Sequence, residues 1–353
     1  MHKVDKHPLL NSWEHVDTFY CPSNKHRVFV CGDIHADYDI KKLSSKNWKE
    51  QKTLTKDDFL ICLGDFGLPW SCGMKDDVTE HKVWDDIIMS SNDKYWLDWL
   101  AAKNYTTLVV LGNHEGSYNI LKYIPSTYYE PINGYVKELK LEKGVIRFLL
   151  RDSEYKINDK RFLVIGGALS IDKEHRTPEI SWWEEELLTK CEEDNILDII
   201  ERGNKFDYVL THTCPKRLIP DLVYGFSDKI YDPVSNFLDF IENRVEFKEW
   251  HFGHFHVDVV RDDNIGDMFQ CHYNSPPLEL GMSVDGTEEP LTDRQEIMEL
   301  RDYCMRYDWV DNTTKELTKY YETLQKTVDG LLEIDEQVPH DLSWELDEIG
   351  KRI

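Results

Sequence analysis

The chain has 353 residues, of which 41% are hydrophobic, and this composition excludes a disordered chain and allows one large core. The formal charge is -25, from 67 acidic and 42 basic residues, and no Lys/Arg cluster offsets it, so a long nucleic acid is not expected as a partner. The sequence has no leader-like N-terminus and no run of about 18 apolar residues, so we expect no membrane association and a cytoplasmic location.

Three buried strands are predicted in the first third of the chain, and each is a short apolar run that ends in a glycine turn. They cover residues 27–31, 58–63 and 107–111. Stretches with helical character follow them at residues 38–51, 78–102 and 117–124. This alternation of strand and helix predicts an α/β layer.

The rest of the chain contains enough apolar runs to build a second sheet. Strands are expected at residues 145–150, 161–165, 208–210, 250–252 and 268–273, and helices at 181–202 and 233–247. From residue 291 the sequence changes to polar helix with apolar residues at helical spacing, which predicts a scaffold or a pairing element. We therefore divide the chain into a main domain, residues 1–290, and a helical C-terminal appendage, residues 291–353, through which two copies could form a homo-oligomer.

Each of the three early turns carries a side chain that can bind a metal ion. The first holds Asp33 and His35, which lie two residues apart and so share one side of an extended chain. The second holds Asp65, whose two carboxylate oxygens can bridge two ions, and the third holds Asn113, an uncharged oxygen ligand. Because the carboxyl ends of parallel strands meet at one edge of a sheet, these turns predict one shared site.

Three histidines further along the chain also follow predicted strands and can bind a metal ion. His254 and His256 are again two residues apart, and His212 follows the predicted strand at 206–210. Taken singly, an aspartate in such a turn is usually a turn residue or a helix cap, and a histidine usually makes ordinary hydrogen bonds. Their joint occurrence favours a pair of metal ions.

Five short blocks together resemble the signature of the calcineurin-like metallophosphoesterase family. They are Gly32 to His35, Gly64 to Asp65, Gly112 to Glu115, Thr211 to Pro215 and Gly253 to His256. The loop from Gly166 to Glu185, with tandem tryptophans, is similar to that of phage and bacterial members. The resemblance implies a layered α/β fold, a β-sandwich flanked by α-helices, with residues 1–290 as the catalytic domain.

The resemblance also implies two divalent metal ions and their ligands. One ion would be held by Asp33, His35, Asp65 and His256, and the other by Asp65, Asn113, His212 and His254. His114 would not bind metal but would face the phosphate and the leaving group, with Glu115 available to orient it. Manganese is the first expectation for the metal, and iron, zinc and nickel are alternatives that mixed oxygen and nitrogen ligands also accept.

These assignments predict a hydrolase in which two cations bind the phosphate and activate a bridging hydroxide, while His114 protonates the leaving group. The predicted substrate is a nucleotide or other small phosphoester, cleaved by a phosphodiesterase or phosphatase activity. The alternatives are a protein Ser/Thr phosphatase and a catalytically silent binding or scaffold module.

The protein phosphatase branch of the family has Asp-Arg-Gly where this chain has Asp65 to Gly67, so the phosphate-binding arginine of that branch is missing here. Arg151, Arg176 and Arg217 could replace it, and Arg176 is the candidate substrate-binding residue. Trp182 and Trp183 have two interpretations, packing on the core or forming a wall above the metals. The eight cysteines include no CxxC pair and are expected to be reduced.

Overall fold

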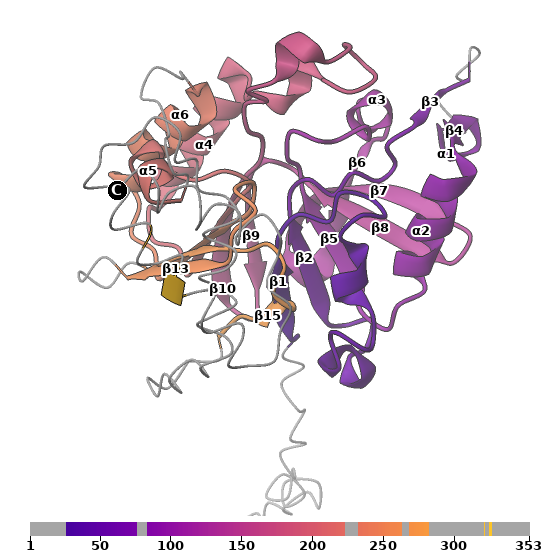
Figure 1. Ribbon diagram of the computed structural model, residues 1–353, viewed down its shortest axis with the longest axis horizontal. Coiled ribbons are helices and arrows are strands. Elements are labelled where there is room, and N and C mark those ends of the chain that lie inside the picture. The colour runs from indigo at the N-terminus through magenta and orange to yellow at the C-terminus, as the bar shows by residue number, and fades with distance from the viewer. Residues whose placement is uncertain are drawn as a thin grey trace, which may run out of the picture.

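The chain is described from a computed structural model that covers residues 26–75, 83–222, 232–262 and 268–281, together with residues 321, 325 and 326. Two β-sheets form the centre of the protein, and the helices lie outside them (Figure 1). A further two-stranded sheet pairs β3 (Cys72–Met74) with β4 (Ile87–Met89). The layered α/β fold expected from the sequence is therefore confirmed.

The first sheet has seven strands, most of them from the first half of the chain. Their order is β15 (Leu278–Glu279), β1 (Val28–Cys31), β2 (Phe59–Leu63), β5 (Thr106–Val110), β8 (Gly144–Leu149), β7 (Gly134–Leu141) and β6 (Ser126–Tyr129). The central strands β1, β2, β5 and β8 are parallel, and the strands at both margins pair antiparallel. The carboxyl ends of the four central strands consequently meet at one edge.

The second sheet has six strands and repeats this plan. Their order is β13 (Val259–Asp262), β14 (Met268–Cys271), β12 (Glu249–Phe252), β11 (Tyr208–Thr211), β10 (Lys160–Ile165) and β9 (Asp152–Ile157). The central strands β14, β12, β11 and β10 are parallel, and β13 and β9 pair antiparallel at the margins.

Three apolar clusters hold the layers together. In β1, Val28 and Val30 face a cluster that also contains Phe162 and Val164 of β10, so the two sheets pack face to face. The alternate residues, such as Phe29, face an outer cluster. The outer layers contain α2 (Ser91–Ala101) and α3 (Tyr118–Leu121) beside the first sheet, and α4 (Lys190–Arg202), α5 (Ile219–Leu222) and α6 (Pro233–Glu242) beside the second.

The predicted helices are shorter in the structure than in the sequence. In place of the one helix predicted at residues 38–51, the structure has 3₁₀ turns at Ile40–Leu43 and Glu50–Thr53. The segment predicted at 78–102 is divided into α1 (Val83–Asp86), β4 and α2, and residues 78–82 lie outside the described residues. Of the predicted appendage, residues 291–353, only residues 321, 325 and 326 are described, so that domain division stays a prediction.

Two further expectations concern the cysteines and membrane association. Cys31 and Cys62 are buried and free, with their sulfurs 3.7 Å apart, as predicted for core thiols. Within the described part of the chain, no helix is both long enough and apolar enough to cross a membrane.

Candidate metal centre

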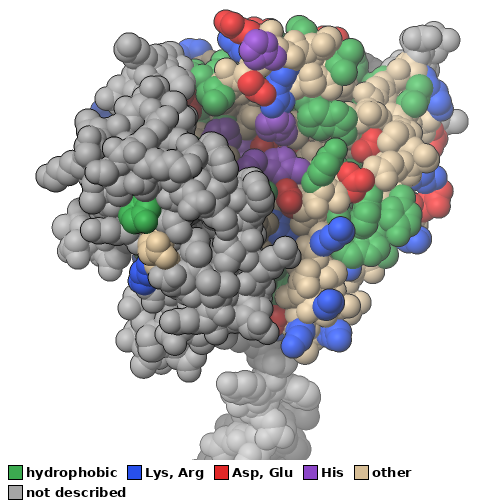
Figure 2. Space-filling model, in the orientation of Figure 1, with side chains coloured by type: hydrophobic (Ala, Val, Ile, Leu, Met, Phe, Trp, Pro, Cys, Tyr) green, Lys and Arg blue, Asp and Glu red, His purple; other side chains and the backbone are tan. Residues whose placement is uncertain are grey.

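All seven predicted ligands lie just beyond the carboxyl ends of central strands. Asp33 and His35 follow β1, Asp65 follows β2, Asn113 follows β5, His212 follows β11, and His254 and His256 follow β12. Figure 2 shows histidine side chains gathered on this face of the molecule, with hydrophobic side chains beside them. The two sheets thus contribute ligands to one common region.

The backbone at this edge is unusual. His35, Asp65, His254 and His256 all have positive φ angles, of 46°, 42°, 70° and 55°. Residues other than glycine rarely adopt this conformation, and strained backbone of this kind tends to cluster at functional sites. At Gly112 a Cβ would collide with the backbone of Asp65, which explains why glycine precedes Asn113.

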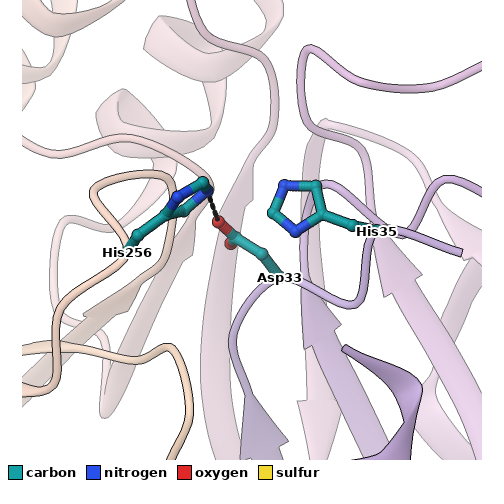
Figure 3. A group of neighbouring side chains, drawn as sticks. All are labelled: Asp33, His35 and His256. Carbon is teal, nitrogen blue, oxygen red and sulfur yellow. Dashed lines mark ion pairs between the residues drawn. The ribbon is translucent and has the colours of Figure 1, made fainter. Parts of the chain in front are cut away.

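Asp33, His35 and His256 form the first cluster. One ligand atom from each lies within 4.8 Å of the others, and the two rings stand on either side of the carboxylate (Figure 3). Asp33 is fully buried and accepts the backbone N–H of His254 at 3.0 Å. The Nδ1 atom of His35 lies 2.8 Å from Asp39 Oδ2, which orients the ring so that Nε2 faces the cluster.

Asp65, His212 and His254 form the second cluster, again with ligand atoms within 4.8 Å of one another. Nδ1 of His212 donates to the carbonyl of Leu63 at 2.7 Å. Its Nε2 therefore faces the site, 3.0 Å from Asn113 Oδ1 and 3.1 Å from Asp65 Oδ1. The structure thus brings Asn113 to this cluster as well.

The clusters share buried negative charge. Burial would raise the pKa of the Asp65 carboxyl, but His212 and His35 hold it well below its usual value. The carboxylates in turn outweigh burial at His35 and raise its pKa to about 9. Burial and the neighbouring His212 instead lower the pKa of His254 to about 3, so its imidazole is neutral and can act as a ligand.

Among the described residues, the ion-pair partners of Asp33 and Asp65 are all histidines. Two buried carboxylates surrounded by imidazoles and one amide oxygen make a donor set that suits divalent cations. The residues present therefore fit the metal ions that the sequence predicts.

His114 lies beside the clusters without belonging to either. Its ring stacks on Trp70, with ring centres 6.3 Å apart, and lies 5.9 Å from the ring centre of His35. The guanidinium of Arg176 approaches it, with nitrogens 2.9 Å from Nδ1 and 3.1 Å from Nε2. The structure therefore brings Arg176 to the site, whereas Arg151 pairs with Glu192 and Arg217 with Glu242.

Glu115 is placed differently from the expectation that it orients His114. Its buried carboxylate accepts the backbone N–H groups of Phe66 at 2.9 Å, Gly67 at 3.2 Å and Gly112 at 3.2 Å. It consequently ties the turn after β2 to the turn after β5. The polar contact with the ring nitrogens of His114 comes instead from Arg176, which is 62 residues away in sequence.

A pocket of about 670 Å³ opens beside His35, His114 and His256. Its other lining residues are Ala36, Asp37, Tyr38, Asp39, Gly67, Trp70, Ser71, Ser90, Asn92, Asp93 and Tyr273. Sequence reasoning missed Trp70 and Tyr273, because neither lies in a ligand-bearing block. Trp183 is buried in the core, and its ring packs edge-to-face with that of Trp70, with ring centres 5.1 Å apart. This supports the core-packing interpretation for Trp183.

Two solved structures resemble the fold weakly. Phosphopantetheinyl hydrolase from Mycobacterium tuberculosis is 14% identical, with a TM-score of 0.36 over 74% of this chain and 98% of that one. GAP50, the anchor in the inner membrane complex of Plasmodium, is 12% identical, with a TM-score of 0.39 over 70% and 71%. No protein with a curated description is significantly similar in sequence.

The sequence profile of the calcineurin-like phosphoesterases matches residues 26–258, which include every residue of both clusters. Members of this family are metal-dependent phosphoesterases. The chain belongs to the calcineurin-like phosphoesterase family and is a metal-dependent hydrolase of phosphoric esters.

Proposed function

We propose that this phosphoesterase uses two divalent metal ions held side by side and acts on a small phosphoester, such as a nucleotide. The position of Asp65 carries the proposal. Its Oδ2 lies 3.4 Å from His35 Nε2, at the first cluster, and its Oδ1 lies 3.1 Å from His212 Nε2, at the second. A carboxylate placed between two sets of imidazoles is suited to bridge two cations.

The ligand sets would follow the two clusters. Asp33, His35, Asp65 and His256 would hold one ion, and Asp65, Asn113, His212 and His254 the other. When bound, such a pair supplies charge that neutralises the phosphate and lowers the pKa of water. Manganese is our first candidate, and iron, zinc and nickel are the alternatives to be tested.

The chain's own residues would manage the substrate and the proton. His114 lies beside the clusters, where its ring can donate a proton to the oxygen of the departing alcohol. Trp70 supports one face of that ring, and Arg176 lies within reach of a phosphate oxygen next to it. An arginine at this place gives the substrate a bidentate partner from a loop far from Asp65.

The nature of the substrate is argued from charge. At a formal charge of -25 the protein repels a long polyanion, whereas a small ester needs only the metals and one nearby cation. The residue after Asp65 is Phe66, which is buried in the core. This turn therefore has no arginine that could bind the phosphate of a phosphoprotein. We therefore propose a cytoplasmic enzyme for small esters, with protein phosphatase activity as the second candidate.

The test begins with protein stripped of metal and supplied with manganese, iron, zinc or nickel. Hydrolysis of bis(4-nitrophenyl) phosphate should rise with added metal and saturate at two equivalents per chain. Asp65→Asn should lose both activity and more than one ion, because a neutral amide bridges cations poorly. Asp159→Asn, at an exposed turn, is the control and should keep both.

Three results would contradict the proposal. Full activity with one ion per chain would contradict the proposal of a two-metal site. Absence of hydrolysis with every metal tested would favour the scaffold alternative. Preference for a phosphopeptide or for duplex DNA over every small ester would overturn the substrate class while leaving the metal site intact.

A further inference from the structure

The pocket beside the metal centre has aromatic walls. Trp70 closes it next to His114, and Tyr273 stacks on the ring of His256, with ring centres 4.6 Å apart and an interplanar angle of 14°. Tyr38 also lines the pocket, with 82% of its surface exposed. A group bound here would therefore lie among aromatic rings.

Apart from its histidines, the ionisable side chains that line the pocket are carboxylic acids and tyrosines. Three carboxylates, Asp37, Asp39 and Asp93, line it, and among the described lining residues there is no lysine or arginine. Arg176 is not part of this lining, although it contacts His114. The cation suited to a phosphate and the acidic pocket are thus separate parts of one site.

Two of the three carboxylates already have partners. Asp39 is paired with Nδ1 of His35 at 2.8 Å. Asp93 accepts the backbone N–H groups of Trp70 at 3.1 Å and Ser71 at 3.0 Å. Asp37 is exposed, and within the described part of the chain its side chain has one long hydrogen bond, 3.5 Å from the amide nitrogen of Asn92, so its charge remains available to a ligand.

We propose that this pocket binds the alcohol part of the substrate and that this part carries an ammonium group. The inference rests on the proposed function and narrows its substrate to phosphoesters of amino alcohols. Aromatic faces and a carboxylate together attract an alkylammonium ion, since the ring quadrupole and the negative charge act in the same direction. A second phosphate in this place would instead meet three carboxylates.

The chemistry of the reaction stays that of hydrolysis. Water supplies the oxygen that forms the new P–O bond, the bond from phosphorus to the alcohol oxygen breaks, and His114 gives that oxygen its proton. The products are phosphate and a free amino alcohol, whose ammonium group remains beside Asp37 until release.

Three monoesters with similar leaving oxygens but different charges test the proposal. They are phosphocholine, glycerol 3-phosphate and 3-phosphoglycerate, whose alcohol parts are cationic, neutral and anionic. With the metal-loaded enzyme, kcat/KM should fall in that order, by about threefold to tenfold at each step, as expected for a partly exposed charge pair with aromatic contacts. A neutral or anionic ester hydrolysed faster than phosphocholine, or a nucleoside monophosphate preferred to it, would overturn the inference.

Variants of Asp37 locate the effect. Asp37→Asn should lower kcat/KM for phosphocholine by about threefold to tenfold and leave glycerol 3-phosphate unchanged. Asp37→Lys should reverse the preference between the two charged alcohol parts, so that 3-phosphoglycerate has a higher kcat/KM than phosphocholine. Asp159→Asn removes another exposed carboxylate, in the turn before β10 and at the other end of that strand from the site, and should change nothing. Unchanged selectivity in both Asp37 variants would contradict the assignment.

Calorimetry of choline binding to the metal-free protein separates this inference from the proposed function. We expect the wild type to bind choline with a dissociation constant on the order of 1 mM, and we expect Asp37→Asn to bind it more weakly. If choline binds in this way but no ester is hydrolysed with any metal, the proposed function fails and the pocket assignment stands. If esters are hydrolysed but choline does not bind, or binds both proteins equally, the pocket assignment fails alone.

Discussion

His114 illustrates how single side chains of this site depend on residues far away in sequence. Trp70 supports its ring on one side, and Arg176 meets both ring nitrogens from a loop 62 residues further on. The sequence located His114 through its block, because the block follows a strand. It could not locate these contacts, since they depend on how two sheets and their loops come together.

Removal of the His114 ring should separate chemistry from metal binding. His114→Ala should lower turnover of an alkyl phosphoester by about 100-fold, because a poor leaving group needs a proton in the transition state. The loss should be smaller for 4-nitrophenyl phosphate, and the metal content should stay near that of the wild type. His175→Ala, an exposed histidine of the Arg176 loop, is the control. Loss of metal, or equal loss with both leaving groups, would contradict the assignment.

Arg176 allows a different separation, between binding and turnover. Arg176→Ala should raise KM by about tenfold and change kcat less, because the guanidinium is proposed to bind the phosphate before and during the reaction. Arg176→Lys should recover part of the loss, since it keeps the charge without the planar fork. Steady-state kinetics on one small ester measures both. A fall in kcat with KM unchanged would argue against a binding role.

At the scale of elements, the sequence predicted best those segments whose signal is local. The strands before Asp33, Asp65 and Asn113 are buried on both faces and consist mainly of apolar and β-branched residues. By contrast, β7 alternates buried and exposed residues within Gly134–Leu141 and contains charged side chains, so its role as a strand became visible only through pairing with β8. The contacts of Glu115 were not visible for a similar reason, because two of its three backbone partners, Phe66 and Gly67, come from another turn.

The start of α4 shows how one carboxylate can order two layers. Glu192 accepts the backbone N–H of Thr189 at 2.7 Å as part of a capping box, which is why the helix begins at residue 190 and not at 181 as predicted. The same carboxylate binds Arg151 at 2.7 and 2.9 Å, and Arg151 is buried where β8 ends. Helix α4 is thereby tied to the end of a strand of the first sheet.

Loss of Glu192 should therefore cost more than an ordinary surface ion pair. Glu192→Ala should lower the free energy of unfolding by about 2–4 kcal/mol, because it removes a helix cap and leaves the buried Arg151 without its charge partner. Glu193→Ala, whose partner Lys190 is exposed, should cost less than about 1 kcal/mol. Urea denaturation followed by circular dichroism measures both. Equal stabilities of the two variants would refute the dual role.

At the scale of the whole molecule, each candidate metal cluster takes side chains from both sheets. Asp33 and His35 come from the first sheet and His256 from the second, and Asp65 likewise meets His212 and His254 of the second. Without cations, two buried carboxylates lie where the sheets meet. Bound metal should therefore hold the sheets together as well as serve the reaction.

Removal of metal should accordingly destabilise the folded protein. Ligand binding at about 100 times the dissociation constant adds about 2.7 kcal/mol to stability, so a chelator should lower the melting temperature by several degrees. Manganese added in excess should restore it. Asp65→Asn should respond weakly to both treatments, because its clusters are proposed to bind metal poorly. A wild-type melting temperature that changes with neither chelator nor added metal would contradict this prediction.

The division of each cluster between two sheets also has a consequence for synthesis on the ribosome. Asp33, His35, Asp65 and Asn113 leave the exit tunnel early, whereas His212 follows about a hundred residues after Asn113, and His254 and His256 emerge later still. Neither ligand set is complete while only the first sheet has been made. A nascent chain can therefore offer the proposed ions a full set of ligands only after β12 has joined the second sheet, so we expect metal loading to follow the folding of the two sheets rather than to begin it.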